Sequence, residues 1–170
     1  HKILRHMDNS AGIEHFPERQ MDMCRLGLGL YGINPRNNKT LNNVSTLQTT
    51  ILQLHRVPQG ESIGYSRKTF LMRDSIIGAI PIGYADGLDR RLSNRKGYCL
   101  VNGKRADYVG NICMDVAMID VTDIACQEGD RVEVFGDHLP VTALSDIMGT
   151  IPYEVLTGIS NRVKRVYFQD

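Results

Sequence analysis

The sequence predicts a mainly β protein, an antiparallel barrel or sandwich preceded by a helical lead-in. Short stretches with the composition of strands follow one another from about residue 44 onward, and turn-forming pairs separate them. Few stretches show the period of a helix. The 170 residues are enough for one domain with a buried core, or for one domain and part of another.

The first 43 residues predict little regular structure. Asn9 and Ser10 precede a short run of helix-compatible residues, and Ser10 is the predicted N-cap. The segment Arg25–Gly32 predicts a strand end followed by tight backbone turns. Asn34–Asn43 holds one proline and several asparagines, which is typical of a connector.

From Val44 the chain predicts strands joined by turns. Asn102-Gly103 is the strongest hairpin signal, because both residues suit a type I′ turn, and Pro58–Glu61 is a second predicted turn. Short helices are predicted at Thr142–Met148, with Thr142 as cap, and at Tyr153–Leu156. The predicted strands are Thr46–Val57, Ser75–Ile82, Tyr98–Val101, Arg105–Val109, Ile112–Val121, Arg131–Phe135 and Ser160–Phe168.

Charge and composition argue against several classes of protein. Twenty basic and nineteen acidic residues, with no block of like charge, do not predict a nucleic-acid or polybasic membrane binder. No apolar run approaches the roughly 20 residues of a transmembrane helix, and no signal peptide is visible. The four cysteines form no CxxC pair, so we expect free thiols and a cytoplasmic protein. Because the chain opens at His1 and continues directly into structure, we expect it to be a piece of something longer.

Residue chemistry alone leaves the function open. The five histidines show neither HxxxH nor HExxH spacing, which argues against a metal site, and GxSxG is absent. Gly27-Leu28-Gly29 predicts either a packing turn or a phosphate-binding turn. Pro81–Gly87 predicts a tight turn with an Asx bond, or a site built on its Tyr and Asp. Tyr65 follows a glycine and precedes Arg67 and Lys68; a tyrosine is a base only where positive charge lowers its pKa from about 10.

Seven motifs together resemble the bacterial alanine racemase family over essentially the whole chain. They are His6–Gly12, Arg25–Gly32, Gly64–Ser66, Pro81–Gly87 with Arg90-Arg91, Val109–Asp115, Tyr153-Glu154 and Arg162–Arg165. The resemblance implies an N-terminal (β/α)8 barrel that carries pyridoxal 5′-phosphate (PLP), followed by a C-terminal antiparallel β-barrel domain. Residues 1–43 match the last part of that PLP barrel and the connector, and residues 44–170 match the β domain.

The family's PLP-binding lysine lies in a Lys-Ala-Asn-x-Tyr-Gly-His-Gly stretch near the start of the barrel. None of the six lysines of this chain stands in that context. The resemblance implies that the parent protein interconverts L- and D-alanine with PLP, and that it supplies D-alanine for the peptidoglycan of the cell wall. The 170-residue chain alone is expected to be inactive. Whether the parent is also fused to a peptidoglycan ligase stays open.

The resemblance also implies roles for residues around the cofactor. Arg25 matches the arginine that bonds the pyridine nitrogen of PLP. Because a guanidinium does not readily give up a proton, that nitrogen stays unprotonated and the ring is a weaker electron sink. The residues that match the phosphate site are Ser10, the backbone at Gly27 and Leu28, and Tyr153.

Further roles concern the substrate. Tyr65 matches the base that removes the α-proton of L-alanine, opposite the lysine that serves D-alanine, and the backbone of Met114 matches a group that holds the substrate carboxylate. Residues matching the access channel and its hydrogen-bond network are Tyr84, Arg90, Ile151 and His6, the last linking Arg25 to Tyr84. The resemblance implies a homodimer in which Tyr65, Tyr84 and Met114 act in the partner's active site.

Two residues or runs depart from the family pattern. Asn111 stands where many members have arginine, and the loss of this channel cation bears on substrate scope and gating. Tyr65 is followed by Ser66-Arg67-Lys68 instead of the commoner glycine, which adds positive charge behind the base. A racemase of serine or another small amino acid is an alternative function. A second alternative is a non-catalytic β-barrel module for oligomerisation or binding. It leaves unexplained why Tyr65, Tyr84, Tyr153 and Arg25 occur together.

Overall fold

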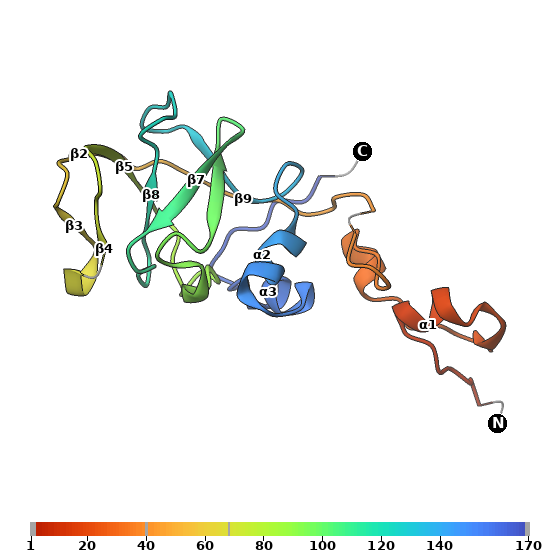
Figure 1. Ribbon diagram of the computed structural model, residues 1–170. Coiled ribbons are helices and arrows are strands. Elements are labelled where there is room, and N and C mark those ends of the chain that lie inside the picture. Colours follow the sequence, from red (N-terminus) through yellow and green to blue (C-terminus); the bar gives the residue numbers. More distant parts are fainter. Residues whose placement is uncertain (1–2, 40, 68, 169–170) are drawn as a thin grey trace. The chain divides into compact units, whose positions relative to one another are not determined.

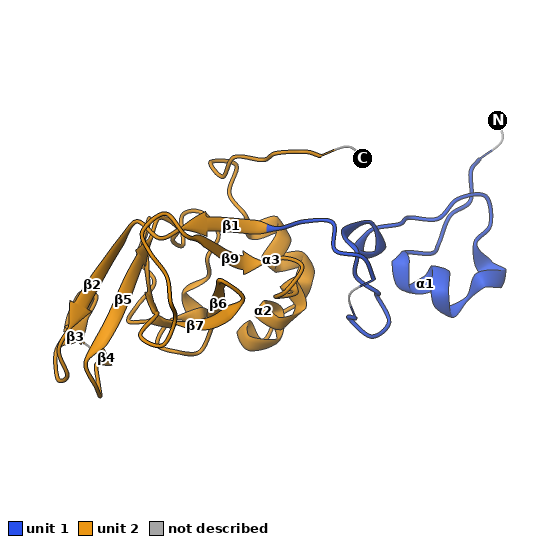
Figure 2. Cartoon of the chain, turned by 90° about the horizontal axis from the view of Figure 1, so that it is seen from above, with its two compact units in different colours: residues 1–46 blue, residues 47–170 orange. Residues whose placement is uncertain are grey.

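The computed structural model describes residues 3–39, 41–67 and 69–168, which belong to two compact units (Figure 1, Figure 2). The first unit is residues 1–46 and contains the helix α1 (Ser10–His15) and the 3₁₀ turns η1 (Pro17–Arg19) and η2 (Leu28–Tyr31). The second unit is residues 47–170 and contains all the strands.

In the first unit, α1 is capped by Asn9, so the prediction of Ser10 as N-cap is wrong by one residue. Asn9 has extended backbone, and its Oδ1 accepts the N–H of Gly12 at 3.0 Å. Ser10 is the first helical residue, and its buried hydroxyl accepts the N–H of Gly27 at 2.7 Å. Ser10 is already inside the helix, so the cap is the extended residue before it. Arg25 forms a single parallel bridge to Asn9, and the tight turns predicted after it are present.

The second unit is an antiparallel sheet of seven strands in the order β1-β9-β6-β7-β8-β5-β2, which confirms the predicted mainly β, antiparallel fold. β3 (Ser62–Ile63) and β4 (Thr69–Phe70) form a separate two-stranded sheet. The seven strands are β1 (Leu47–Thr50), β2 (Gln53–Val57), β5 (Ser75–Ile80), β6 (Tyr98–Val101), β7 (Lys104–Val109), β8 (Ala117–Asp120) and β9 (Arg131–Phe135).

The predicted single strand Thr46–Val57 is two strands, β1 and β2, at opposite edges of the sheet. Between them, Ile51 donates its N–H to the carbonyl of Asp130 beside β9, whereas Leu52 donates to the carbonyl of Ala79 in β5. One extended segment therefore pairs first with β9 and then with β5, at the two ends of the strand order. The sheet must curl for this to happen, and the result is a barrel-like wall around a common core.

The core lies inside this curl and extends to two helices, α2 (Val141–Met148) and α3 (Pro152–Gly158). Ile80, Tyr108 and Val132 are fully buried in it, and both helices contribute side chains to the same cluster. α2 begins after Pro140 and ends at Gly149, which has a φ of +68°. The prediction of Thr142 as cap is wrong: Thr142 lies inside the helix and is buried, and the N-cap is Pro140, two residues earlier, whose backbone is extended.

Two further strand predictions are too long, and a third is wrong. β5 ends at Ile80 because Pro81 has no N–H and Ile82 turns back to bond the carbonyl of Ile80. The predicted strand Ile112–Val121 is reduced to β8, since a loop occupies its first half. Ser160–Phe168 is not a strand: the Arg165 guanidinium donates to the carbonyls of Ile159 and Ser160, which holds this segment in a loop.

Candidate active site

Two loops of the second unit meet backbone to backbone, and they carry Tyr84 and Met114. The Tyr84 N–H donates to the Cys113 carbonyl and the Ala85 N–H donates to the Met114 carbonyl, both at 3.0 Å. A Cβ atom on Gly83 would lie 2.3 Å from the Met114 carbonyl oxygen, so only glycine allows this approach. The Met114 carbonyl is bonded to Ala85, and a carboxylate needs a donor. The backbone N–H of Met114 is therefore the group of this residue that is suited to a carboxylate.

A hydrogen bond from within the turn, to the side chain of Asp86, stabilises the Tyr84 turn. This buried carboxylate accepts the Gly83 N–H at 2.8 Å, so the bond of the predicted Asx turn runs backward along the chain. Arg162 binds Asp86 at 2.9 Å and Asp115 at 2.5 Å. The hydrogen bond to Asp115 and the charge of Asp86 raise the pKa of Arg162. One guanidinium thus ties the C-terminal segment to both loops.

Tyr65 stands in the turn between β3 and β4 with 76% of its surface exposed. The chain reverses here through left-handed backbone: φ is +73° at Gly64, +67° at Ser66 and +46° at Arg67. The Arg67 Nε donates to the Ser62 hydroxyl at 3.2 Å, at the base of the same hairpin. Lys68, the other cation expected near Tyr65, lies outside the described residues.

The residues expected in an access channel lie around η4 (Arg90–Leu92) and the start of α3. The Arg90 guanidinium carbon lies 5.9 Å from the centre of the Tyr84 ring, and Ile151 is exposed just before α3. Arg91 binds both Asp89 and Glu154 at 2.8 Å, and these two hydrogen bonds raise the pKa of Arg91. The pair with Glu154 connects η4 to the helix that carries Tyr153.

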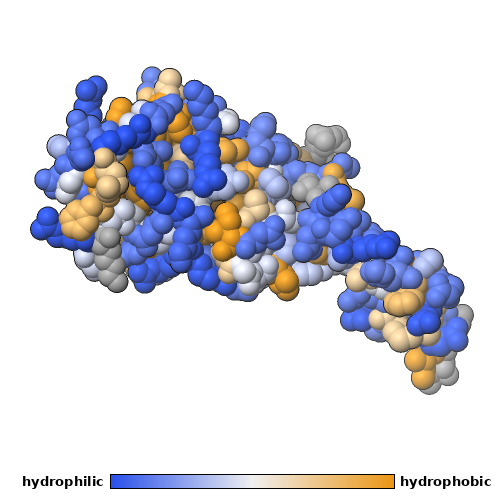
Figure 3. Space-filling view, viewed as in Figure 1, coloured by the Kyte–Doolittle hydropathy of each residue, from blue (hydrophilic) through white to orange (hydrophobic). Residues whose placement is uncertain are grey.

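On the face of the second unit seen in Figure 3, apolar side chains form small separate groups among hydrophilic ones. The large, exposed side chains of this unit include five residues that the sequence singled out: Tyr65, Tyr84, Met114, Ile151 and Tyr153. Tyr153 lies in α3, and the other four lie in turns, in loops or just before a helix, where binding residues concentrate.

In the first unit, Arg25 lines an open hollow of about 390 Å³. Its guanidinium donates to the Met7 carbonyl at 2.9 Å, and its backbone N–H donates to the Asp8 carbonyl. Asp8 also lines the hollow. Its Oδ2 is buried and has no hydrogen-bond partner among the described residues. His6 is exposed; the expected chain from Arg25 through His6 to Tyr84 stays a prediction.

Comparison with known proteins identifies the family. Residues 44–167 match the family model described as alanine racemase, C-terminal domain. The chain belongs to the alanine racemase family. A crystal structure of alanine racemase from Bartonella henselae, described with covalently bound pyridoxal phosphate, is similar with a TM-score of 0.91 and 35% identity; the match covers 99% of this chain and 48% of that one.

Two relatives extend the similarity to the whole of the chain. Alanine racemase 1 of Clostridium acetobutylicum is 41% identical over 98% of this chain, and alanine racemase 1 of Caldanaerobacter subterraneus is 43% identical over 98%. These matches cover 46% and 45% of the relatives. The chain therefore spans about half the length of the alanine racemases it matches.

Several groups that support the racemase-like loops were not predicted. Arg162 was predicted only as part of a motif, without a role. Thr69 and Asn94, whose side chains hydrogen-bond to each other at 2.8 Å, were not singled out. The polar run from Ser93 to Gly97 signals a turn, but nothing in it indicates which loops that turn joins.

Among residues 3–39, 41–67 and 69–168, no three His, Cys, Asp or Glu side chains gather as metal ligands, and no helix is long and apolar enough to cross a membrane. Cys24, Cys99, Cys113 and Cys126 form no disulfide.

Proposed function

We propose that this chain is the C-terminal half of a PLP-dependent alanine racemase that interconverts L- and D-alanine, with Tyr65 as the base for the L-enantiomer. The observation that supports it best is the shared scaffold of Tyr84 and Met114, which Arg162 ties together, in a chain of this family that also exposes Tyr65. A proton-transfer site on a small amino acid needs a base and a donor for the carboxylate. We assign these roles to the phenol of Tyr65 and the backbone N–H of Met114.

The first unit supplies most of the residues that we propose for the cofactor. The Arg25 guanidinium lines the hollow and is a donor suited to an acceptor nitrogen or oxygen there. The Ser10 hydroxyl accepts from Gly27 and still has a hydrogen to donate to a phosphate oxygen. We propose that Ser10, Gly27, Leu28 and Tyr153 hold the phosphate, and that Arg25 faces the pyridine nitrogen. When bound, PLP withdraws electrons from the α-carbon of the amino acid.

The chain's own residues would then bind the substrate and move one proton. As the phenolate, Tyr65 Oη would take the α-proton from one face of L-alanine and become the phenol, which returns the proton to that face in the reverse direction. The Met114 N–H donates to the substrate carboxylate, and Tyr84, Arg90 and Ile151 restrict access and exclude water. Racemisation requires a second base on the opposite face, and we propose that a lysine outside this chain supplies it.

The experiment is to assay the full-length parent for interconversion of L- and D-alanine, with L- and D-serine as competing substrates. Tyr65→Phe should lower the alanine rate by about 10²–10⁴-fold, the usual contribution of a general base. Tyr167→Phe removes a more exposed phenol from the C-terminal segment and should leave the rate unchanged. A wild-type parent that racemises serine faster than alanine would favour the alternative substrate. A parent inactive on both would leave a binding module.

A further inference from the structure

The hairpin that carries Tyr65 is too small to hold its own position. β3 and β4 share only two residue pairs, Ser62 with Phe70 and Ile63 with Thr69. A two-stranded hairpin is marginally stable by itself in water. Its base is anchored, because Ile63 and Leu71 are buried in a small cluster with Ile77. The turn at Tyr65 lies beyond this anchor and needs a further support.

That support comes from Asn94, on a turn between η4 and β6. Asn94 Oδ1 accepts from the Thr69 hydroxyl at 2.8 Å, and its Nδ2 donates to Asn111 Oδ1 at 3.1 Å. Its backbone N–H donates to the Gly110 carbonyl at 3.0 Å, and its φ is +59°, a left-handed value that asparagine tolerates. We name the three side chains of Thr69, Asn94 and Asn111 the Asn94 bridge. It connects the Tyr65 hairpin to the loop that continues to Met114.

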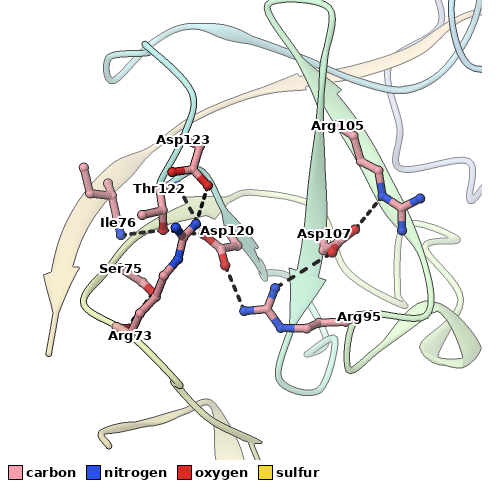
Figure 4. Close-up of polar contacts among 9 residues, drawn as sticks. All are labelled: Arg73, Ser75, Ile76, Arg95, Arg105, Asp107, Asp120, Thr122 and Asp123. Atoms are coloured by element: carbon pink, nitrogen blue, oxygen red, sulfur yellow. Dashed lines mark hydrogen bonds and ion pairs between the residues drawn. The ribbon is translucent and has the colours of Figure 1, made fainter. Parts of the chain in front are cut away.

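The turn that holds Asn94 is itself fixed to the sheet by the next residue (Figure 4). The Arg95 guanidinium binds Asp120 of β8 at 2.8 Å and lies 3.8 Å from Asp107 of β7, which also binds Arg105 at 2.7 Å. The Arg95 N–H donates to the Tyr108 carbonyl at 2.7 Å. A continuous series of hydrogen bonds and ion pairs therefore runs from the sheet through Arg95 and Asn94 to the hairpin.

Burial raises the pKa of Asp120, but hydrogen bonds from the Thr122 hydroxyl and the Arg95 guanidinium outweigh it and hold that pKa below its usual value. Asp120 is therefore ionised at neutral pH and keeps its charge toward Arg95. Nearby, Arg73 binds the exposed Asp123, and Thr122 accepts the Ile76 N–H at 3.1 Å (Figure 4). These contacts close the polar network from β5 to β7.

We propose that Asn94 is a positioning residue for the racemase reaction: through Thr69 and Asn111 it sets where the Tyr65 hydroxyl stands relative to the Met114 loop. This inference rests on the proposed function. Asn94 touches neither the substrate nor the phenol in this scheme. It acts by restricting the hairpin, and a displacement of about 1 Å from productive geometry can cost up to roughly 10²-fold in rate.

Two variants break the bridge at different points while sparing the backbone. Thr69→Val removes the hydroxyl with little change of shape, and Asn94→Gly removes both side-chain bonds but favours the same left-handed φ. Thr69→Ser keeps the hydroxyl and serves as the rescue. Asn102→Gly is the matched control: Asn102 is also left-handed, at +51°, and its Nδ2 bonds Ala125 and Asp130 at the far β6–β7 turn.

The measurement uses the full-length parent and compares solvent-deuterium exchange at the α-carbon of L-alanine with that of D-alanine. Thr69→Val and Asn94→Gly should slow exchange from L-alanine about tenfold and change exchange from D-alanine little, because Tyr65 serves only the L face. Thr69→Ser and Asn102→Gly should match the wild type. Amide hydrogen exchange of residues 61–71 should be faster in both bridge variants and unchanged over residues 98–109.

The outcomes separate the two proposals. A wild-type parent that exchanges neither enantiomer overturns the proposed function. A wild-type parent that is active, with both bridge variants slowed equally for L- and D-alanine, shows that the bridge is merely structural and overturns the positioning role. An active parent whose bridge variants exchange both L- and D-alanine at the wild-type rates overturns the positioning role as well.

Discussion

At the residue scale, Gly83 shows how one missing side chain brings two loops together. Its backbone packs so closely on the Cys113 and Met114 carbonyls that a Cβ atom would lie 2.4 and 2.3 Å from their oxygens. The obstacle is backbone, which cannot move aside as the end of a flexible side chain can. Any larger residue must therefore separate the Tyr84 turn from the Met114 loop.

Gly83→Ala should lower the free energy of unfolding by about 2–3 kcal/mol, the cost of overpacking a closed contact. Gly158→Ala is the control, since a Cβ atom there meets nothing within 4 Å and its φ is not left-handed. It should be neutral or slightly stabilising. Urea unfolding of the two variants measures both effects, and equal midpoints would contradict the steric role of Gly83.

Residue chemistry in the sequence located the groups but not their partners. A tight turn with an Asx bond was expected over Pro81–Gly87; the turn is present, but Asp86 accepts from the preceding Gly83 N–H and not from a residue that follows it. That Asp86 would be bound by Arg162, 76 positions further along, depends on how distant segments pack. Ser10 shows the same limit. Its residue type suits a cap, but a nearby Gly27 N–H competes for its hydroxyl, and local sequence does not contain that competition.

At the scale of elements, local signals succeeded where the turn chemistry is specific. Asn102 and Gly103 both have positive φ, +51° and +74°, as a type I′ turn requires, and β6 and β7 pair on either side. The prediction of one strand from Thr46 to Val57 is wrong because the composition of this segment is that of a strand throughout and does not mark the break between β1 and β2. The bend at Ile51 arises from pairing with two different partners, β9 and β5, and pairing is not encoded locally.

The pairing of β7 with β8 is reinforced by Arg95, and this support should depend on pH. The pKa of Asp120 is lowered in the folded protein, so its contribution to stability is complete above the ordinary value of 3.8. It is lost as the pH falls below that value through the lowered pKa. Asp120→Asn should therefore reduce the free energy of unfolding by about 1 kcal/mol at pH 7 and by progressively less in acid.

The control is Asp123→Asn, which removes the more exposed partner of Arg73. Exposed ion pairs contribute about 0–1 kcal/mol, so this change should be the smaller of the two at every pH. Thermal unfolding of both variants between pH 7 and pH 3 makes the comparison. A loss at Asp120→Asn that grew with acidity would contradict the direction of its pKa shift.

At the scale of the whole molecule, the sequence predicted the class of fold and the change of character near residue 44. The family match begins at residue 44, and the two compact units divide after residue 46. We propose that residues 1–43 are the end of a PLP-binding barrel, as their motifs suggest. The cofactor's lysine is matched by none of the six lysines in the chain.

The 170-residue chain should therefore bind PLP weakly and without a covalent bond, because no lysine stands in the family's Schiff-base motif. Treatment with PLP and borohydride, followed by intact mass measurement, tests this. The wild-type full-length parent is the positive control and should gain one pyridoxyl group. A site-specific adduct on a native lysine of the 170-residue chain would show the prediction to be wrong.

The last prediction concerns which subunit supplies Tyr65 in the parent. We propose a homodimer in which Tyr65 acts in the partner's active site. A Tyr65→Phe parent and a parent lacking the PLP lysine should each be almost inactive. Mixed under conditions of subunit exchange, each heterodimer would contain one site with both defects and one site with neither. Each heterodimer should therefore have about half of the wild-type activity, and an equimolar, randomly exchanged mixture should recover about a quarter of it. Tyr167→Phe mixed with the lysine-deficient parent gives the reference level for exchange. If heterodimers form and activity does not return, Tyr65 acts within its own chain, because then every site in the mixture still lacks one of the two bases.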